Sequence, residues 1–176
     1  MVRLHFILVL FFGIFGSVEL VAQQKNWEAT QTDIRFFIRN AGLEVEGTFG
    51  QVTGTFVTQG PDNLPLLIVG TAKVKSIDTG IGLRDSHLRS KEYFNAASFP
   101  ELRMQLISIN EKTARFNVSI RGKSKTYDIP YTWKLSQNQG LFAADFTLNR
   151  LDFLVGGKSM IMGDEVIVKI KLTLKK

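Results

Sequence analysis

The stretch Thr126-Tyr127-Asp128-Ile129-Pro130-Tyr131-Thr132-Trp133-Lys134-Leu135 alternates large apolar residues with polar residues and one proline. The stretch Val166-Ile167-Val168-Lys169-Ile170-Lys171-Leu172-Thr173-Leu174-Lys175 follows nearly the same rule. A period of two places one set of side chains on one face, which predicts strands that bury that face. Looser alternation marks residues 34–39, 43–58, 66–76, 101–110, 115–121 and 141–148.

Turn-forming residues separate these predicted strands at 40–42, 60–63, 110–112, 121–123 and 138–140. Successive strands with short connections favour an antiparallel meander. About eight such strands can close into a barrel, which removes exposed strand edges. We therefore expect an all-β chain, an antiparallel eight-stranded β-barrel with one short helical connection around residues 82–97.

The chain begins with a segment that differs from the rest. Residues 1–5 carry positive charge, the apolar run 6–15 follows, and Ala22 stands a little beyond it. This layout is typical of a secretory signal peptide. The alternative, an uncleaved anchor, is disfavoured because the run is shorter than the roughly 20 apolar residues that a spanning helix needs. We expect a signal peptide at 1–22 and a soluble, periplasmic or secreted domain at 23–176.

One connection departs from the strand pattern and holds the most distinctive residues. It reads Ser76-Ile77-Asp78-Thr79-Gly80-Ile81-Gly82-Leu83-Arg84-Asp85-Ser86-His87-Leu88-Arg89-Ser90 and runs on through Tyr93-Phe94 to Phe99-Pro100. This run resembles the signature segment of the YceI-like family. Further matches follow in chain order at Gly47-Thr48-Phe49, Ile120-Arg121-Gly122, Asn149-Arg150-Leu151-Asp152-Phe153 and Gly163-Asp164-Glu165-Val166.

Members of the YceI-like family are lipocalin-like β-barrels that bind polyisoprenoid and related lipids. The resemblance covers essentially all of the chain after the leader, so it implies that residues 23–176 form a YceI-like lipid-binding β-barrel domain. One departure is evident. Many members begin their first strand with Asp-x-x-His-Ser, whereas residues 30–34 of this chain contain no histidine. This chain therefore lacks the residue for any function that requires that histidine.

The spacing of the aromatic residues alone favours core packing over pocket lining, because every barrel core requires inward apolar side chains. The resemblance implies the second role, an apolar tunnel for a lipid. The side chains expected to line it are Phe36, Phe49, Phe56, Leu88, Phe94, Phe99, Tyr131, Trp133, Ala144, Phe146 and Phe153.

Four polar residues are candidates for the mouth of the barrel. They are Arg84, Asp85, His87 and Arg150. Side-chain hydrogen bonds from such groups can tie a loop or short helix across the mouth. We expect them to make those bonds or to meet the polar end of a lipid.

A catalytic reading has weak support. His87 and Asp85 could form a base with its orienting carboxylate, but there is no Gly-x-Ser-x-Gly elbow to supply a nucleophile. The one histidine beyond the expected leader and scattered carboxylates do not form a metal motif, and the absence of cysteine excludes thiolate ligands and disulfides. We expect no enzyme, no metal and no cofactor other than a bound lipid.

The net charge of +6 raises the question of nucleic acid. The lysines of the predicted strands, such as Lys169 and Lys171, alternate with apolar residues, and no aromatic residues are interleaved with them on the same face. We therefore expect no nucleic-acid partner. A basic exterior would favour transient contact with an anionic membrane surface, since each nearby Lys or Arg adds about 1 kcal/mol of attraction.

Together with the resemblance, these features imply an exported binding protein. It would hold a long apolar lipid, namely a polyisoprenoid, an isoprenoid quinone or a fatty lipid, inside its barrel for storage or transport. The alternative that stays open is a stress-protective or interaction protein whose barrel is filled by its own side chains. An enzyme that acts on a lipid ranks third.

Overall fold

The computed structural model describes residues 23–60, 62–136 and 138–176, so the expected leader at 1–22 lies outside the described residues. The helices in those ranges include none that is long and apolar enough to cross a membrane. The elements are β1 (Gln24–Asn40), β2 (Leu43–Phe49), β3 (Val52–Gln59), β4 (Leu64–Lys73), η1 (Val74–Ser76), β5 (Ile77–Asp78), α1 (Gly82–Arg89), β6 (Glu101–Ile109), β7 (Thr113–Ile120), β8 (Lys123–Ser136), β9 (Gln139–Asn149), η2 (Arg150–Phe153) and β10 (Met162–Lys175).

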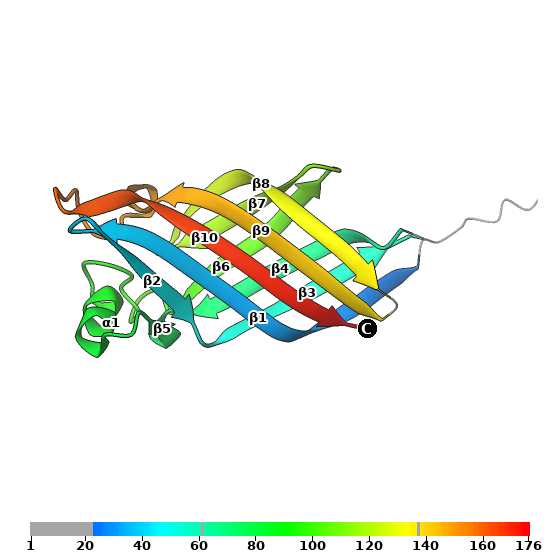
Figure 1. Ribbon diagram of the computed structural model, residues 1–176, viewed down its shortest axis with the longest axis horizontal. Coiled ribbons are helices and arrows are strands. Elements are labelled where there is room, and N and C mark those ends of the chain that lie inside the picture. The colour runs from blue at the N-terminus through cyan, green and yellow to red at the C-terminus, as the bar shows by residue number, and fades with distance from the viewer. Residues whose placement is uncertain (1–22, 61, 137) are drawn as a thin grey trace, which may run out of the picture.

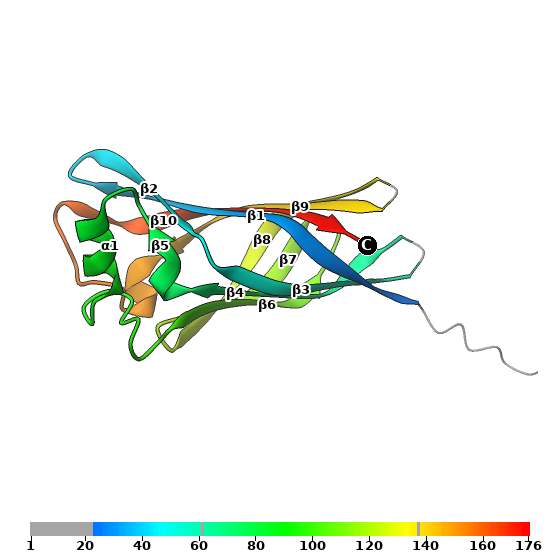
Figure 2. The ribbon, with the colours of Figure 1, turned by 90° about the horizontal axis from the view of Figure 1, so that it is seen from below.

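The strands form one antiparallel sheet that closes on itself (Figures 1 and 2). Its order is β10-β9-β8-β7-β6-β4-β3-β1-β2-β5, and β10 also pairs with β1. The closed circuit therefore contains eight strands, and β2 and β5 extend the wall beside β1. This arrangement confirms the predicted all-β, eight-stranded barrel.

The first strand is long enough to take part in three pairings. Residues 24–27 of β1 pair with β3, residues 35–40 pair with β2, and β10 runs along residues 28–40. A register shift between Ala29 and Gln31 marks a bulge opposite β10. Sequence alternation predicted one continuous strand at 43–58, but the structure divides it into β2 and β3 at Gly50 and Gln51. This division matters because it leaves part of β1 without a strand partner on the side opposite to β10.

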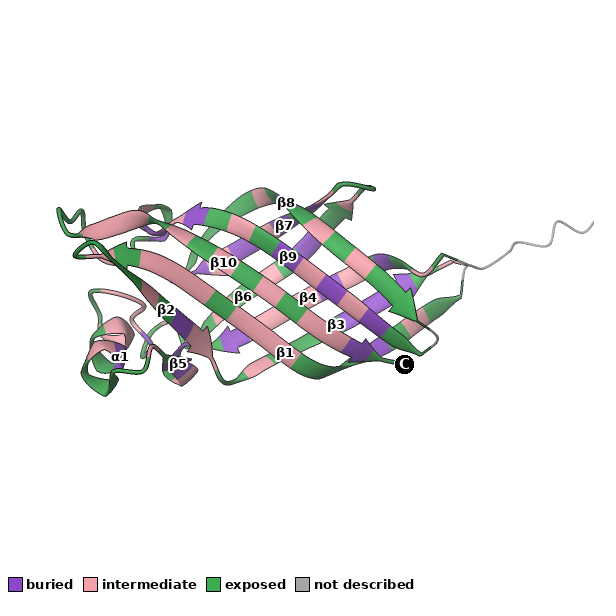
Figure 3. Cartoon of the chain, in the orientation of Figure 1, coloured by how far each residue is buried: buried purple, intermediate pink, exposed green. Residues whose placement is uncertain are grey.

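The barrel buries alternate residues of its strands, as the banding in Figure 3 shows. On β7 the burial alternates along the whole strand, with Ala114, Phe116, Val118 and Ile120 on the inner face. Phe116, Phe142 and Phe153 are among the largest fully buried side chains. Their burial contributes about 1.5–3 kcal/mol per side chain to folding.

The connection between β5 and β6 is helical only in its first half. The helix α1 covers Gly82–Arg89, and Ser90 already has extended backbone angles. Hydrogen-bonded turns replace the helix beyond that point, such as the bond from the N–H of Asn95 to the carbonyl of Ser90 at 2.8 Å. The helical connection is therefore confirmed, with a regular helix shorter than 82–97. It lies at one end of the barrel (Figure 2).

Candidate functional site

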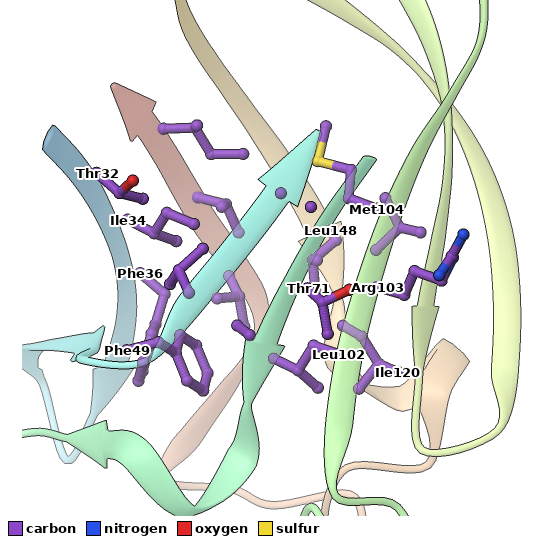
Figure 4. A pocket seen from close by; sticks show the side chains of 18 of the residues that line it. Thr32, Ile34, Phe36, Phe49, Thr71, Leu102, Arg103, Met104, Ile120 and Leu148 are labelled. Carbon is purple, nitrogen blue, oxygen red and sulfur yellow. The ribbon is translucent and has the colours of Figure 1, made fainter. Parts of the chain in front are cut away.

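A cavity of about 720 Å³ occupies the interior of the barrel (Figure 4). Its wall is built mainly from aliphatic and aromatic side chains of β1, β3, β4, β6 and β10. The volume lies within the range of about 300–1,000 Å³ that is usual for small-molecule sites. Residues that represent the wall on opposite sides are Ile34, Phe36, Leu102, Met104, Ile120 and Leu148.

Aromatic side chains close one end of the cavity. Trp27, Phe56 and Phe142 line it and are buried. Trp133 packs behind them, with its ring centroid 5.6 Å from that of Trp27 and 5.0 Å from that of Phe56. Tyr131 stacks on Phe142 at 5.9 Å. The cavity therefore ends at the first layer of rings and does not extend to Tyr131 or Trp133.

Three phenylalanines lie toward the opposite end, near α1. The ring of Phe49 is 5.7 Å from that of Phe36 and 6.4 Å from that of Phe94, and all three line the cavity. Gly47 makes this packing feasible because a Cβ at this position would stand 2.2 Å from the ring of Phe36. The Gly-x-Phe motif at 47–49 thus shapes the cavity wall.

Polar groups in the connection that holds α1 bind mainly to each other. Asp85 is buried and accepts hydrogen bonds from the backbone N–H and the hydroxyl of Thr79, at 2.9 and 2.5 Å. Arg84 donates to the hydroxyl and the carbonyl of the same threonine, at 2.8 and 2.6 Å. The Ser-Ile-Asp-Thr-Gly and Arg-Asp motifs therefore fix the chain that leads into the helix.

Arg150 is 3 % exposed, and each N–H group of its guanidinium has an acceptor in the protein. A guanidinium has five such groups, so none is left for a ligand. The charge is partnered by the carboxylate of Asp164 at 2.8 Å. The acceptors are the carbonyls of Val155, Gly157, Met162 and Gly163 and the Oδ1 atom of Asp164. Arg150 thereby holds the connection between β9 and β10 at the mouth.

His87 is the polar residue of this group with the greatest freedom. Its side chain is 60 % exposed, its Nε2 atom lies 3.7 Å from a carboxylate oxygen of Glu92, and its ring packs edge-on to Tyr93 at 4.8 Å. Asp85, the partner that a catalytic reading would give it, instead accepts from Thr79. His87 therefore borders the cavity without a buried carboxylate to orient it.

The structure divides the expected site residues into those that line the cavity and those that do not. Ten of the expected site residues line the cavity: Phe36, Phe49, Phe56, Leu88, Phe94, Phe146, Phe153, Arg84, His87 and Arg150. Four of the residues expected to line the tunnel lie outside the lining, which corrects their expected placement: Phe99, Tyr131, Trp133 and Ala144. Asp85, which was expected to make hydrogen bonds at the mouth, also lies outside the lining and accepts hydrogen bonds from Thr79. Phe99 packs on the turn at Gly122, where a Cβ would stand 2.8 Å from its ring.

The reason for these differences is geometric. Alternation assigns a side chain to the inner or outer face of a strand, but not to a height along the barrel axis. Tyr131, Trp133 and Ala144 do face inward, yet at the height of the aromatic end. Some lining residues were not predicted. The inner face of β10 contributes Val166, Val168, Ile170 and Leu172 to the cavity wall, and the alternation at 166–175 was the sequence signal that could have indicated them.

A closed eight-stranded barrel around an apolar cavity defines a lipocalin-like binding architecture. The model of the YceI-like domain family matches residues 26–174. The chain therefore belongs to the YceI-like domain family, as the motifs in its sequence indicated.

Relatives and solved structures agree with this assignment. The chain is 31% identical over 87 residues to UPF0312 protein plu2095 of Photorhabdus laumondii, covering 49% of this chain and 45% of that one. It is 27% identical over 105 residues to Protein YceI of Salmonella arizonae, covering 59% and 55%. The matched segments thus span about half the length of these curated relatives.

Two solved structures share the fold. BcnA of Burkholderia cenocepacia superposes with a TM-score of 0.74 at 21% identity, covering 81% of this chain and 95% of that one. A polyisoprenoid binding domain from Saccharophagus degradans, implicated in plant cell wall breakdown, superposes with a TM-score of 0.68 at 12% identity, covering 85% and 97%. At these identities the likeness shows the fold alone.

Proposed function

We propose that this protein is a lipid-binding barrel that stores or transports a long apolar molecule: a polyisoprenoid, an isoprenoid quinone or a fatty lipid. The observation that carries the proposal is the internal cavity of about 720 Å³ with its aliphatic and aromatic wall. Membership of the YceI-like family and the fold shared with a polyisoprenoid binding domain support it.

The energetics of such a site need few polar contacts. Each methylene group that leaves water for an apolar wall contributes about 0.8 kcal/mol. A chain of several isoprene units could therefore be held by the wall of the cavity alone. The alternative function, a stress-protective or interaction protein, assumes a barrel filled by its own side chains. Such a barrel would leave no cavity of this size.

We propose binding rather than catalysis for the same cavity. The candidate pair of His87 and Asp85 is divided, because Asp85 is buried and accepts from Thr79. The described residues include no group of three or more His, Cys, Asp or Glu side chains that could hold a metal ion. The described wall of the cavity therefore offers neither a base with its orienting carboxylate nor a set of ligands for a metal-bound water, the two arrangements that would favour catalysis.

The test is to purify the protein from its own host, extract it with organic solvent and analyse the extract by mass spectrometry. We expect a long-chain lipid at a stoichiometric level. Delipidated protein should take up an isoprenoid and gain thermal stability, since a ligand that binds only the folded state stabilises it. The proposal fails if the delipidated protein takes up neither isoprenoid nor fatty lipid and its melting temperature stays constant.

We also propose that the protein is exported and acts as a soluble periplasmic or secreted protein. The charged and apolar layout of residues 1–22 supports export. The mass of the protein isolated from its host measures this directly. A mature N-terminus near Gln23 is expected, and an intact N-terminus in the membrane fraction would contradict it.

A contact with anionic membranes is proposed at the end of the barrel that carries α1. The turn between β1 and β2, the helix α1 and the connection from η2 to β10 lie together at this end (Figures 1 and 2). They carry exposed large apolar side chains beside a lysine: Leu43, Leu83, Met160, Ile161 and Lys158. Apolar tips next to cations suit a lipid surface of negative charge.

Co-sedimentation with anionic vesicles tests this contact. The double variant Leu83→Ser with Met160→Ser should weaken it, whereas Leu64→Ser, at an exposed apolar site at the start of β4, should not. Added salt should also weaken it. Binding that salt and the double variant both leave unchanged would count against the contact.

A further inference from the structure

The wall of the barrel has a gap between β1 and the strand pair β2 and β3. Residues 24–27 of β1 pair with β3 and residues 35–40 pair with β2, but within the described residues no strand pairing joins 28–34 to 49–55. The two stretches pair with other strands on their far sides but not with each other. They are equal in length, and the register is the same on both sides of them. We call these two stretches the side slit.

Hydrogen bonds on the far side of the junction between β2 and β3 hold the side slit open. The N–H groups of Gly50 and Gln51 donate to the carbonyl and the hydroxyl of Ser76, at 3.1 and 3.0 Å. The carbonyl of Gln51 accepts from the N–H of Lys73 at 2.9 Å. The junction is therefore bound to η1 and the end of β4. On the opposite strand, the bulge at Thr30 falls within the same interval.

The cavity reaches both edges of this gap. Thr32 and Ile34 of β1 line the cavity at one edge of the side slit (Figure 4). Thr53 and Thr55 line it at the other edge, although side-chain alternation places them on the face of β3 opposite to the buried Phe56. The lining of the cavity therefore includes both strands that border the side slit.

The side slit is also where the cavity has free hydrogen-bonding groups. Thr53 and Thr55 lie at its edge and are among the lining residues, and their hydroxyls have no protein hydrogen-bond partner within the described residues. The backbone N–H and C=O groups that each unpaired strand directs toward the other lack a ladder partner too. Near α1, by contrast, the charged groups of Arg84 and Arg150 donate to protein acceptors, and the side chain of His87 is mostly exposed to solvent.

We propose that the ligand passes into the barrel sideways through the side slit and that its uncharged polar end stays there. This inference rests on the proposed lipid-binding function and adds to it the portal and the class of ligand. The ligand is an amphiphile with a neutral hydrogen-bonding end, such as a hydroxyl or a carbonyl. Its chain lies in the apolar interior, and its polar end bonds to threonine hydroxyls and strand edges.

Labelling of single thiols tests the portal, because the chain contains no cysteine of its own. Thr53→Cys carries a bulky maleimide at the side slit. Thr126→Cys is the matched control, since Thr126 is an exposed strand threonine that does not line the cavity. Leu83→Cys places the same label on the exposed surface of α1. Stopped-flow fluorescence then measures the uptake and release of a fluorescent long-chain alcohol.

We expect the label at Thr53 to slow release by about tenfold or more, an effect that a rise of about 1.4 kcal/mol in the barrier produces. Labels at Thr126 and Leu83 should leave the rates unchanged. Equal rates for labels at Thr53 and Thr126, or slowing by the label at Leu83 alone, would overturn the portal. If unlabelled protein takes up no amphiphile at all, the proposed function fails, and the portal with it.

A photoreactive probe tests the position of the polar end. The probe is a long-chain alcohol with a diazirine beside its hydroxyl, and the cross-linked residues are read by mass spectrometry. We expect cross-links within residues 28–34, 49–55 or 69–71. Cross-links confined to residues 79–95 would place the polar end near α1 and overturn this part of the inference while leaving lipid binding intact.

Discussion

The indole N–H of Trp27 donates a 2.9 Å hydrogen bond to the hydroxyl of Thr58, a side chain with no exposed surface. The bond links β1 to β3 in the segment where these two strands are paired. It also orients the Trp27 ring, which packs edge-on to Trp133. A single buried hydroxyl thus secures both the aromatic end of the cavity and one boundary of the side slit.

The variant Thr58→Val keeps the shape of this residue and removes its acceptor. The Trp27 N–H would remain buried without a partner, so we expect the free energy of unfolding to fall by about 1–3 kcal/mol. Urea denaturation measures it. Thr126→Val, at an exposed position, is the control and should stay within about 0.5 kcal/mol of the parent protein. Equal midpoints for both variants would show that the buried bond contributes nothing.

Replacement of Arg150 should be among the most destabilising single changes. Arg150→Met leaves the carbonyls of Val155, Gly157 and Gly163 without their donor, and we expect a loss of about 3 kcal/mol or more. Arg115→Met is the control, because Arg115 pairs with Asp128 on the exposed surface and such pairs contribute about 1 kcal/mol or less. Comparable losses in the two variants would contradict the role given to Arg150.

Two tryptophan substitutions distinguish cavity from packed core. Met104→Trp adds volume inside the cavity, so it should reduce lipid uptake while the protein remains folded. Ala144→Trp adds volume where Ala144 is 3 % exposed and outside the lining, so it should overpack the core and destabilise by about 1–3 kcal/mol. Uptake assays and thermal melts measure both effects. A Met104→Trp protein that unfolds and an Ala144→Trp protein that does not would reverse this assignment.

Two tyrosines of β8 differ in their hydroxyl partners. The hydroxyl of Tyr127 is buried and has no hydrogen-bond partner among the residues that the structure describes, whereas that of Tyr131 donates to the carbonyl of Asn110 at 2.8 Å. Tyr127→Phe should therefore leave stability unchanged or raise it by about 1 kcal/mol, and Tyr131→Phe should lower it by about 1 kcal/mol. Denaturation at neutral pH measures both, and a clear loss in Tyr127→Phe would reveal a partner for that hydroxyl.

Burial, followed by the charge of Asp152, raises the pKa of Tyr127. The folded protein therefore favours the neutral phenol. Its contribution to stability is fully present below the unfolded pKa of about 10 and is lost as the pH rises through the higher folded value. Tyr127→Phe should accordingly lose less stability than the parent protein at strongly alkaline pH. Parallel pH profiles for the two proteins would contradict the raised pKa.

Sequence periodicity was sufficient to predict the barrel. The alternation at 126–135 and 166–175 corresponds to β8 and β10, with Ile129 and Leu174 fully buried. The glycines at 80 and 82 and the charged pair at 84–85 also indicated a distinct connection, and the structure shows Arg84 and Asp85 bound to Thr79. These features are local, since one strand or turn suffices to specify them.

The site was less predictable because its shape depends on contacts between distant strands. The height of Trp133 along the barrel follows from its pairing with Phe142, which no local pattern contains. The break at Gly50 and Gln51 depends on Ser76, a residue in another element. The side slit appears only when the pairings of β1 with both neighbours are compared.

The aromatic end of the cavity has a consequence for selectivity. Trp27, Phe56 and Phe142 form a fixed floor, with the ring of Trp133 behind it. Trp27 and Phe56 adjoin the two stretches of the side slit, so a tail whose polar end stays there, as proposed, has little room toward this floor. Under the proposed function the rings would therefore act as an end stop: they would direct the tail toward Phe36 and Phe49 at the other end of the cavity, and the room on that side would limit the length of the tail.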